Sequence, residues 1–326
     1  MRVGVIGAGI SGIACATRLL DQGHDVHIFD RGRRIGGRMA SRTLRDTKTD
    51  FDGRVVDYGA SYFTISSNDF RAAMAPLLES GIVREWTDTF HVAEPEGIIG
   101  VKTGPMRYAA PGGLRTVVEA LAEPLPTSAC TFPHEVERVE ASPSKYSIDG
   151  QPFDAVAMCV PVPQAGKCMA ADLLPPRVNV WEPVIAVTMV FANRTWQELD
   201  GVFVNDDPVI TWIADDGSRR GDGAPVVVAH VNPVLAAGHL QDPPAVIPFA
   251  IATVRKVLGI SEYPDWSWAH RWSLAKPLPV PGPPDVPRSW IHPHMRLGFA
   301  GDAFSAEPRV EAAWLSGTEL GDLLIR

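Results

Sequence analysis

The chain opens with a pattern of apolar positions that predicts a strand, a helix and a second strand. Residues 2–6 form a run rich in valine and isoleucine, which is typical of a fully buried parallel strand. Apolar residues then recur at helical spacing over residues 10–22, and Gly23 marks the end of that helix. A second buried strand is predicted at residues 26–29. This order of elements is the repeating unit of a Rossmann-like α/β sheet.

Three glycines fill the turn between the first strand and the first helix. Gly7, Gly9 and Gly12 have the spacing in which each glycine meets a steric demand: a tight turn, close approach of the backbone to a pyrophosphate, and close packing of the helix on the strand. Asp30 ends the second strand, where a carboxylate can accept hydrogen bonds from ribose hydroxyls. Together these residues predict a dinucleotide-binding fold.

A second glycine cluster indicates which dinucleotide is bound. Gly36, Gly37, Arg38 and Met39 follow shortly after Asp30, where a dehydrogenase that binds only a nicotinamide cofactor would enter its second helix. At this point the sequence resembles the amine-oxidase-type FAD superfamily, in which this glycine pair and arginine run along the FAD pyrophosphate and ribityl chain. The planar fork of arginine suits that role because it can bind two oxygens at once. The chain departs from the resemblance at Asp30, where most of the superfamily has glutamate.

The last segment resembles a second FAD signature of the same superfamily. Residues 297–300 predict a strand, Gly301 and Asp302 end it, and an amphipathic helix is predicted from Arg309 onward. The resemblance implies that Asp302 holds a ribityl hydroxyl. The positive end of the helix would then face the flavin pyrimidine ring, where negative charge gathers on reduction. Since signatures at opposite ends of the chain must meet around one ligand, a long cofactor such as noncovalent FAD is expected.

The resemblance extends to segments between these signatures. A valine in residues 134–140, which alternate like a half-buried strand, would contact the adenine through its backbone. The predicted cofactor-binding residues are Gly7, Gly9, Gly12, Asp30, Arg31, Gly37, Arg38, Met39, Gly59, Ala60, Val136, Gly301, Asp302, Arg309, Val310 and Ala313.

The middle of the chain predicts a second domain. Strand-like runs alternate with turns rich in glycine, proline and aspartate, which indicates an antiparallel substrate domain inserted into the FAD domain. In the FAD domain the expected elements are a helix after the Gly-Gly turn within residues 108–122 and a strand at 153–163. In the substrate domain they are strands at 184–191, 209–213 and 226–231, a helix at 244–258, and a proline-rich return at 277–287. The predicted FAD domain comprises residues 1–72, 106–168 and 288–326, and the predicted substrate domain comprises residues 73–105 and 169–287.

Composition excludes several classes of function. The 326 residues are 45% hydrophobic and 21% charged, which is typical of a globular protein. A net charge of −8 without a basic run argues against nucleic-acid binding. The four cysteines have no metal-ligand or disulfide spacing, so no metal is expected. Residues 3–17 are uncharged but contain glycines and lack a cleavage site, and no stretch has membrane-spanning length, so a cytoplasmic location away from membranes is expected.

Within the superfamily, the chain resembles the renalase family, whose members oxidise misreduced isomers of NAD(P)H. The runs that carry this resemblance are FDRGRRIGGRM, YAAPGGL, FDAVAMCVPVP and VITWIADDGSRR. Amine-oxidising relatives carry a lysine where alignment by eye places Ala186, and no cysteine follows Cys168 to bind flavin covalently. The resemblance implies hydride transfer from a 2- or 6-dihydronicotinamide to flavin N5, driven by aromatisation, with O2 as acceptor and hydrogen peroxide as product.

Candidate substrate contacts are Tyr62, Trp212 and His230, with Arg219 and Arg220 able to meet substrate phosphates. The aromatic residues could stack on a nicotinamide, although core packing is an alternative for all three side chains. Two other functions stay open. One is an oxidase or desaturase of amines or polyenes, and the other is a binding protein on the same fold that has lost catalysis.

Overall fold

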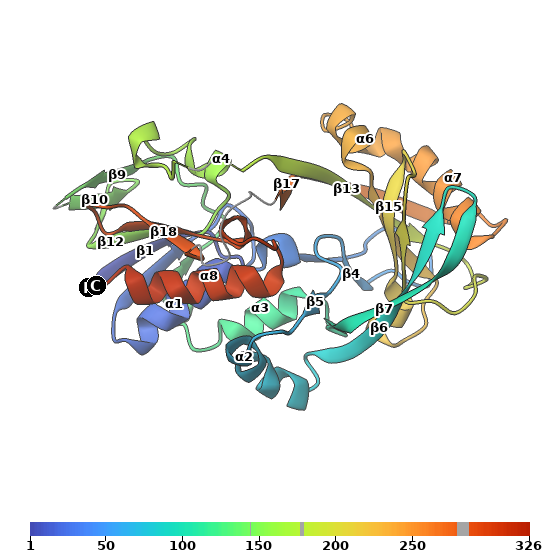
Figure 1. The fold of residues 1–326 in the computed structure, drawn as a ribbon, viewed down its shortest axis with the longest axis horizontal. Helices are drawn as coiled ribbons and strands as arrows, with labels where there is room; N and C mark the ends of the chain where they lie inside the picture. Colours follow the sequence, from blue (N-terminus) through green and yellow to red (C-terminus); the bar gives the residue numbers. More distant parts are fainter. Residues whose placement is uncertain (144, 177–178, 279–286) are drawn as a thin grey trace. The chain divides into compact units, whose positions relative to one another are not determined.

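The computed structural model describes residues 1–143, 145–176, 179–278 and 287–326. The chain forms two compact units, each built from separate segments of sequence (Figure 1). The first unit contains Met1–Met39, Val118–Val180 and Pro277–Arg326, and the second contains Ala40–Val117 and Trp181–Lys276. The α/β fold with an inserted, mainly antiparallel region confirms the predicted fold class.

The first unit is built on a six-stranded sheet with strand order β18-β19-β12-β1-β2-β8. Its strands are β1 (Arg2–Ile6), β2 (Asp25–Phe29), β8 (Cys130–Thr131), β12 (Ala155–Met158), β18 (Ser289–Ile291) and β19 (Leu297–Ala300). All neighbours pair in parallel except β18, which runs antiparallel to β19. The central strand β1 is almost wholly apolar because it is buried between β2 and β12.

Two long helices of the first unit lie against each other, as Figure 1 shows for α1 (Ile10–Asp21) and α8 (Val310–Leu323). Gly317 permits this approach, because a β-carbon there would lie 2.0 Å from the carbonyl oxygen of Ser11. A three-stranded antiparallel sheet adds β9 (Val139–Ser142), β10 (Lys145–Ile148) and β11 (Gln151–Phe153). The short helices are α4 (Val162–Ala165), η1 (Gly37–Met39), η2 (Thr127–Ala129), η3 (Ala171–Leu173) and η5 (Asp302–Phe304).

The second unit is built on an eight-stranded sheet with strand order β17-β13-β16-β15-β14-β6-β7-β5. Its strands are β5 (Phe63–Thr64), β6 (Arg84–Glu94), β7 (Gly97–Ala109), β13 (Trp181–Val190), β14 (Gly201–Val204), β15 (Ile210–Asp215), β16 (Val226–Val231) and β17 (Trp266–Pro277). A separate two-stranded sheet pairs β3 (Ser41–Thr43) with β4 (Val55–Asp57). The helices are α2 (Asn68–Glu79), α5 (Asp216–Arg220), α6 (Pro233–Gly238), η4 (Pro243–Val246) and α7 (Ile247–Leu258), and α3 (Arg115–Leu121) spans the boundary between the units.

Most predicted elements are confirmed within a few residues, and two strand predictions were wrong in part. Residues 134–138 are not strand, and β9 begins only at Val139. The strand expected over 153–163 ends at Met158, because Pro161 and Pro163 lack an N–H for the sheet and instead begin the short helix α4. The proline-rich return at 277–287 falls mostly on residues 279–286, which lie outside the described residues.

The units divide the chain at places other than the predicted domain limits. Residues 40–72 and 106–117 belong to the second unit, whereas the predicted FAD domain included them. The reason is strand pairing: β3 pairs with β4, and β5 pairs with β7 of the eight-stranded sheet. The functional assignment of FAD and substrate domains stays a prediction.

Candidate functional site

The glycines of the first motif leave the backbone at the start of α1 without covering side chains. A β-carbon on Gly12 would lie 1.8 Å from the carbonyl oxygen of Gly7, so the turn and the helix admit no side chain there. At Gly9 the nearest atom to a β-carbon is the Cα of Gly37, at 3.8 Å. The two glycine motifs therefore pack against each other, since a β-carbon on Gly37 would lie 3.0 Å from the Cα of Gly9. Gly9 is also the N-cap of α1 and offers no side-chain cap, which leaves the first amides of the helix available to an anion.

Asp30 holds the glycine turn in place. Its carboxylate accepts hydrogen bonds from the backbone N–H groups of Ala8 at 2.7 Å and Gly32 at 2.6 Å. An ionised carboxylate has about four acceptor positions. Two of them serve the turn, so the remaining positions can accept ribose hydroxyls. Arg31 beside it is exposed, and Val136 is half-buried against the core of the first unit.

The N-terminal and C-terminal motifs meet in a bidentate ion pair. The guanidinium of Arg38 donates to the two carboxylate oxygens of Asp302 at 2.8 and 2.6 Å, although the two residues are 264 positions apart. Asp302 is 8% exposed, and Met39 beside the arginine is buried. Two parallel hydrogen bonds of this kind fix the orientation of the two side chains and also strengthen the ion pair. The first unit thus brings together the two signatures that sequence placed around one cofactor.

The start of α8 lies directly after this ion pair. Its N-cap, Arg309, makes no side-chain cap, and the guanidinium pairs with Glu307 at 3.2 Å and with the buried Glu311 at 3.6 Å. Val310 is half-buried and Ala313 is 7% exposed. Gly301, just before Asp302, donates its N–H to the Ser316 hydroxyl at 2.8 Å, which ties the strand end to the helix.

In the second unit, buried arginines hold the segment of residues 57–62. Arg219 has no exposed surface, donates to the carbonyl oxygens of Asp57 at 3.1 Å and Ser61 at 3.2 Å, and pairs with Asp216. Arg220 pairs with Asp57 at 3.2 Å and Asp216 at 3.0 Å. The expectation that these arginines meet substrate phosphates at an exposed mouth was wrong. Both are buried because α5 turns their guanidiniums inward onto two carboxylates, and they act as positioning residues.

This arginine cluster makes a testable contribution to stability. Burial raises the pKa of Asp216, but the guanidiniums of Arg220, Arg219 and Arg54 lower it further, so the pKa stays well below its usual range. A carboxylate with a depressed folded-state pKa contributes stability above its unfolded pKa of about 4, and that stability is lost as the pH falls toward the folded-state value. We expect Arg219→Met to destabilise the protein by about 3–5 kcal/mol and to move acid unfolding to higher pH. Thermal unfolding between pH 3 and 8 measures both effects.

Arg71→Met is the control for that experiment, because Arg71 is an exposed arginine on α2 of the same unit. It should leave the melting temperature and its pH dependence unchanged. Equal acid sensitivity of the Arg219 variant and the wild type would contradict the role given to the cluster.

The same segment brings several predicted residues together. The backbone of Gly59 lies beside the His230 imidazole, and Ser61 accepts a hydrogen bond from the Trp212 indole at 3.0 Å. Burial, followed by the charge of Arg219, lowers the pKa of His230 to about 4, so its ring is neutral at neutral pH. The Nε2 of His230 is buried without a hydrogen-bond partner among the described residues. An orphaned polar atom of this kind is costly and suits contact with a ligand or water.

The two aromatic candidates lie in one cluster of rings. Tyr62 is half-buried and lies 5.8 Å from Trp212 and 5.3 Å from Phe90, measured between ring centroids. Trp212 is only 6% exposed and covers Gly201, where a β-carbon would lie 2.3 Å from the indole. Ala60, between Gly59 and Ser61, is half-buried. Contact between either ring and a substrate stays a prediction.

Sequence reasoning missed a second aromatic cluster in the second unit. Tyr58 contacts the rings of Trp268, His270 and Trp272, all on strand β17. The available signal was the alternation of aromatic residues in WSWAHRW, because alternate residues of a strand point to the same face. What the sequence did not show is that Tyr58, more than 200 positions earlier, completes the cluster.

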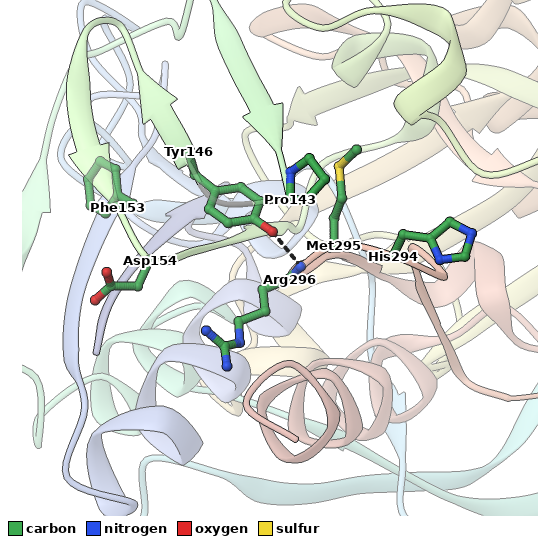
Figure 2. Close-up of a pocket in the computed structure, with 7 residues that line it drawn as sticks. All are labelled: Pro143, Tyr146, Phe153, Asp154, His294, Met295 and Arg296. Carbon is green, nitrogen blue, oxygen red and sulfur yellow. Dashed lines mark hydrogen bonds between the residues drawn. The ribbon is translucent and has the colours of Figure 1, made fainter.

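A shallow pocket of about 430 Å³ lies elsewhere in the first unit, as shown in Figure 2. Tyr146 lies on its wall and accepts a hydrogen bond from the backbone N–H of Arg296 at 2.7 Å. The lining contains none of the predicted cofactor residues. Within the described ranges, no cluster of potential metal ligands was found, and no helix is long and apolar enough to cross a membrane.

Comparison with known proteins identifies relatives of this arrangement. The family described as NAD(P)-binding Rossmann-like domain matches residues 5–77, and the family described as flavin containing amine oxidoreductase matches residues 84–320. The chain is 51% identical over 39 residues to 4,4'-diapophytoene desaturase (4,4'-diaponeurosporene-forming) of Staphylococcus aureus (strain Newman). That match covers 12% of this chain and only 8% of the desaturase.

Solved structures share the fold over the full chain. A candidate protoporphyrinogen oxidase from Exiguobacterium sp. 255-15 superposes with a TM-score of 0.74 at 14% identity, covering 98% of each chain. Putrescine oxidase bound to putrescine superposes with a TM-score of 0.67 at 15% identity, covering all of both chains. At such low identity these structures support the fold alone.

Proposed function

The chain belongs to the flavin containing amine oxidoreductase family, and from this premise we propose that it oxidises isomeric dihydronicotinamides in the manner of renalases. Membership of that family supports the coarser part of the proposal, an FAD-dependent oxidoreductase that acts on a small molecule. The finer proposal concerns the hydride donor, a 2- or 6-dihydro isomer of NAD(P), and the acceptor, O2. A cytoplasmic location stays a prediction.

The residues of the first unit fit FAD. The glycine backbone at Gly9 and Gly37 and the uncapped start of α1 would hold the pyrophosphate. Asp30 has acceptor positions left for the adenosine ribose, while Arg38 and Asp302 would hold the ribityl region. When bound, FAD supplies a ring that accepts a hydride and is reoxidised by O2 to give hydrogen peroxide.

The observation that carries the finer proposal is the lack of a lysine at position 186. Ala186 lies in β13, is fully buried and pairs in register with His230 of the neighbouring strand. The residue beside it is therefore a neutral imidazole, because the pKa of His230 is lowered to about 4 by burial and by Arg219. Amine oxidation would use the lysine that the resembling enzymes carry. A dihydronicotinamide gains aromaticity when it loses hydride, so it needs orientation rather than a strong base.

In this proposal the side chains of the second unit orient the substrate. His230 offers its unpartnered Nε2 as a hydrogen-bonding group, and Tyr62 and Trp212 offer aromatic faces. Arg219 and Arg220 keep residues 57–62 in place from within the core. An oxidase of amines or a polyene desaturase is the alternative, and it is as consistent with the family as the first proposal is.

Anaerobic rapid mixing of the purified flavoprotein with 2-, 4- and 6-dihydro isomers of NAD and NADP tests the proposal. We expect the 2- or 6-dihydro isomers to bleach the flavin absorbance at least about 100-fold faster than an equal concentration of simple amines, a difference worth about 2.7 kcal/mol. Titration of His230 should not change the rate of flavin reduction between pH 6 and 8, because the pKa of His230 is lowered to about 4.

Rapid bleaching by an amine or polyene, with none by any dihydronicotinamide, would favour the alternative. A protein that takes up no flavin would instead indicate a binding protein on this fold.

A further inference from the structure

We infer that the second unit carries a binding site for a heteroaromatic ring bearing a phosphate, as found in each half of a nicotinamide dinucleotide. The choice of a dinucleotide rests on the proposed function. The site consists of four rings, the Arg42 guanidinium that contacts one of them, and the charge of Arg115, which acts on Tyr58; its residues are Tyr58, Trp268, His270, Trp272, Arg42 and Arg115.

Tyr58 is the centre of the aromatic cluster. Its ring centroid lies 5.4 Å from that of Trp268, 4.6 Å from that of His270 and 5.5 Å from that of Trp272. The Trp272 indole donates a hydrogen bond to the Tyr58 carbonyl oxygen at 2.7 Å, which fixes the strand to the tyrosine. All four rings are half-buried rather than enclosed in the core. A planar ligand can therefore reach an ordered aromatic surface.

Strand β17 supplies three of these rings because they occupy alternate positions. Residues 268, 270 and 272 point to the same face of the strand. The strand lies at the edge of the eight-stranded sheet and pairs with β13.

Two polar side-chain groups of this cluster stay available to a ligand. Among the residues that the structure describes, neither the Tyr58 hydroxyl nor the His270 imidazole takes part in a hydrogen bond. Burial, then the charges of Arg42 and Arg271, lower the pKa of His270 to about 4. The ring is thus neutral at neutral pH and presents one donor and one acceptor, as nucleobase and carboxamide edges require.

Two arginines give the cluster positive charge, and among the described residues neither forms an ion pair with a carboxylate. The Arg42 guanidinium lies 4.0 Å from the centroid of the Trp268 ring. Burial raises the pKa of the Tyr58 hydroxyl, and the charges of Arg115 and Arg42 oppose that rise. In the described part of the chain, neither arginine has an ion-pair partner, and the Nε atom of each is buried without a hydrogen bond. A phosphate would supply the missing acceptors, since the arginine fork matches its geometry.

This charge distinguishes between ligand classes. A cationic amine would be repelled by the two guanidiniums, and a polyene would leave their donors unsatisfied. A nucleotide provides both a ring for the aromatic face and an anion for the arginines. The adenine half and the nicotinamide half share this chemistry.

The test measures binding of AMP, nicotinamide mononucleotide and NAD⁺ to the FAD-loaded protein by calorimetry, together with KM and kcat for flavin reduction by the dihydronicotinamide that reacts. We expect Arg42→Gln and Arg115→Gln each to raise Kd and KM by about tenfold, with kcat changed less than about twofold, as for loss of one hydrogen bond to a charged group. Arg42→Lys should recover part of the loss. Weakened binding of only AMP, or only nicotinamide mononucleotide, would identify the half that occupies the site.

Arg45→Gln is the matched control, because Arg45 is exposed and lies three positions further along the chain. Unchanged Kd and KM in both glutamine variants, with melting temperatures equal to the wild type, would overturn the inference. If either variant fails to fold, Tyr58→Phe removes only a hydroxyl and should weaken nucleotide binding by a smaller factor. Nucleotide binding that depends on Arg42, without flavin reduction by any dihydronicotinamide, would overturn the proposed function and leave this site standing.

Discussion

Gly9→Ala is expected to yield a folded protein without flavin, whereas Gly12→Ala is expected not to fold. Both changes add one methyl group to the same glycine motif. At Gly12 that methyl carbon would lie 1.8 Å from the carbonyl oxygen of Gly7, a backbone atom that cannot move without breaking the turn. We expect a loss of stability on the order of 3 kcal/mol or more, at the upper end of the cost of overpacking.

At Gly9 the same methyl carbon has space, since its nearest neighbour is the Cα of Gly37 at 3.8 Å. The backbone of Gly9 has a φ of −75°, which alanine adopts without strain. The fold should therefore survive. The methyl group would instead occupy the space through which a pyrophosphate approaches the helix start, so FAD affinity should fall at least about 100-fold, or about 2.7 kcal/mol.

Circular dichroism, melting temperature and the ratio of flavin to protein absorbance after gel filtration separate the two outcomes. Gly23→Ala is not a suitable control because Gly23 has a φ of +79°. Gly238→Ala is suitable, since a β-carbon there meets nothing within 4 Å and the residue has no positive φ. A Gly9→Ala protein with full FAD content would refute the assignment of this motif to the pyrophosphate.

The second large effect is expected from Asp302→Ala. The carboxylate of Asp302 receives both hydrogen bonds from Arg38 and is itself nearly buried. Its removal would take away the carboxylate that orients the guanidinium of Arg38 and the direct ion pair between the N-terminal and C-terminal motifs. We expect FAD affinity to fall about 100-fold or more, and stability to fall by about 1–3 kcal/mol, because Arg38 is about one-third exposed and keeps part of its hydration.

Fluorescence titration of the apoprotein with FAD gives the affinity, and urea unfolding gives the stability. Asp322→Ala is the matched control, because Asp322 also pairs with an arginine of the first unit, Arg18 at 2.6 Å, but lies near the end of α8 rather than before its start. It should retain FAD with unchanged affinity. Equal FAD affinity in the Asp302 variant and this control would show that the ion pair has no part in holding the cofactor.

The sequence by itself determined those elements that depend only on residues close together in the chain. The glycine motif, the buried strands β1 and β19 and the helices α1 and α8 could be predicted because close packing, burial and helical periodicity are written in neighbouring residues. The meeting of Arg38 and Asp302 was expected in outline, since two signatures of one cofactor must converge. Their direct pairing was not, because it depends on how β19 lies within the sheet.

Only the tertiary structure decided which polar and aromatic residues are exposed. From the sequence, Arg219 and Arg220 were expected to be able to meet substrate phosphates, but α5 places them against Asp57 and Asp216 in the core of the second unit. No local sequence pattern singled out Tyr58, and its role follows only from its contacts with three rings of β17. The physical reason is that burial and pairing across more than 100 positions depend on strand order and register, which no local pattern of residues specifies.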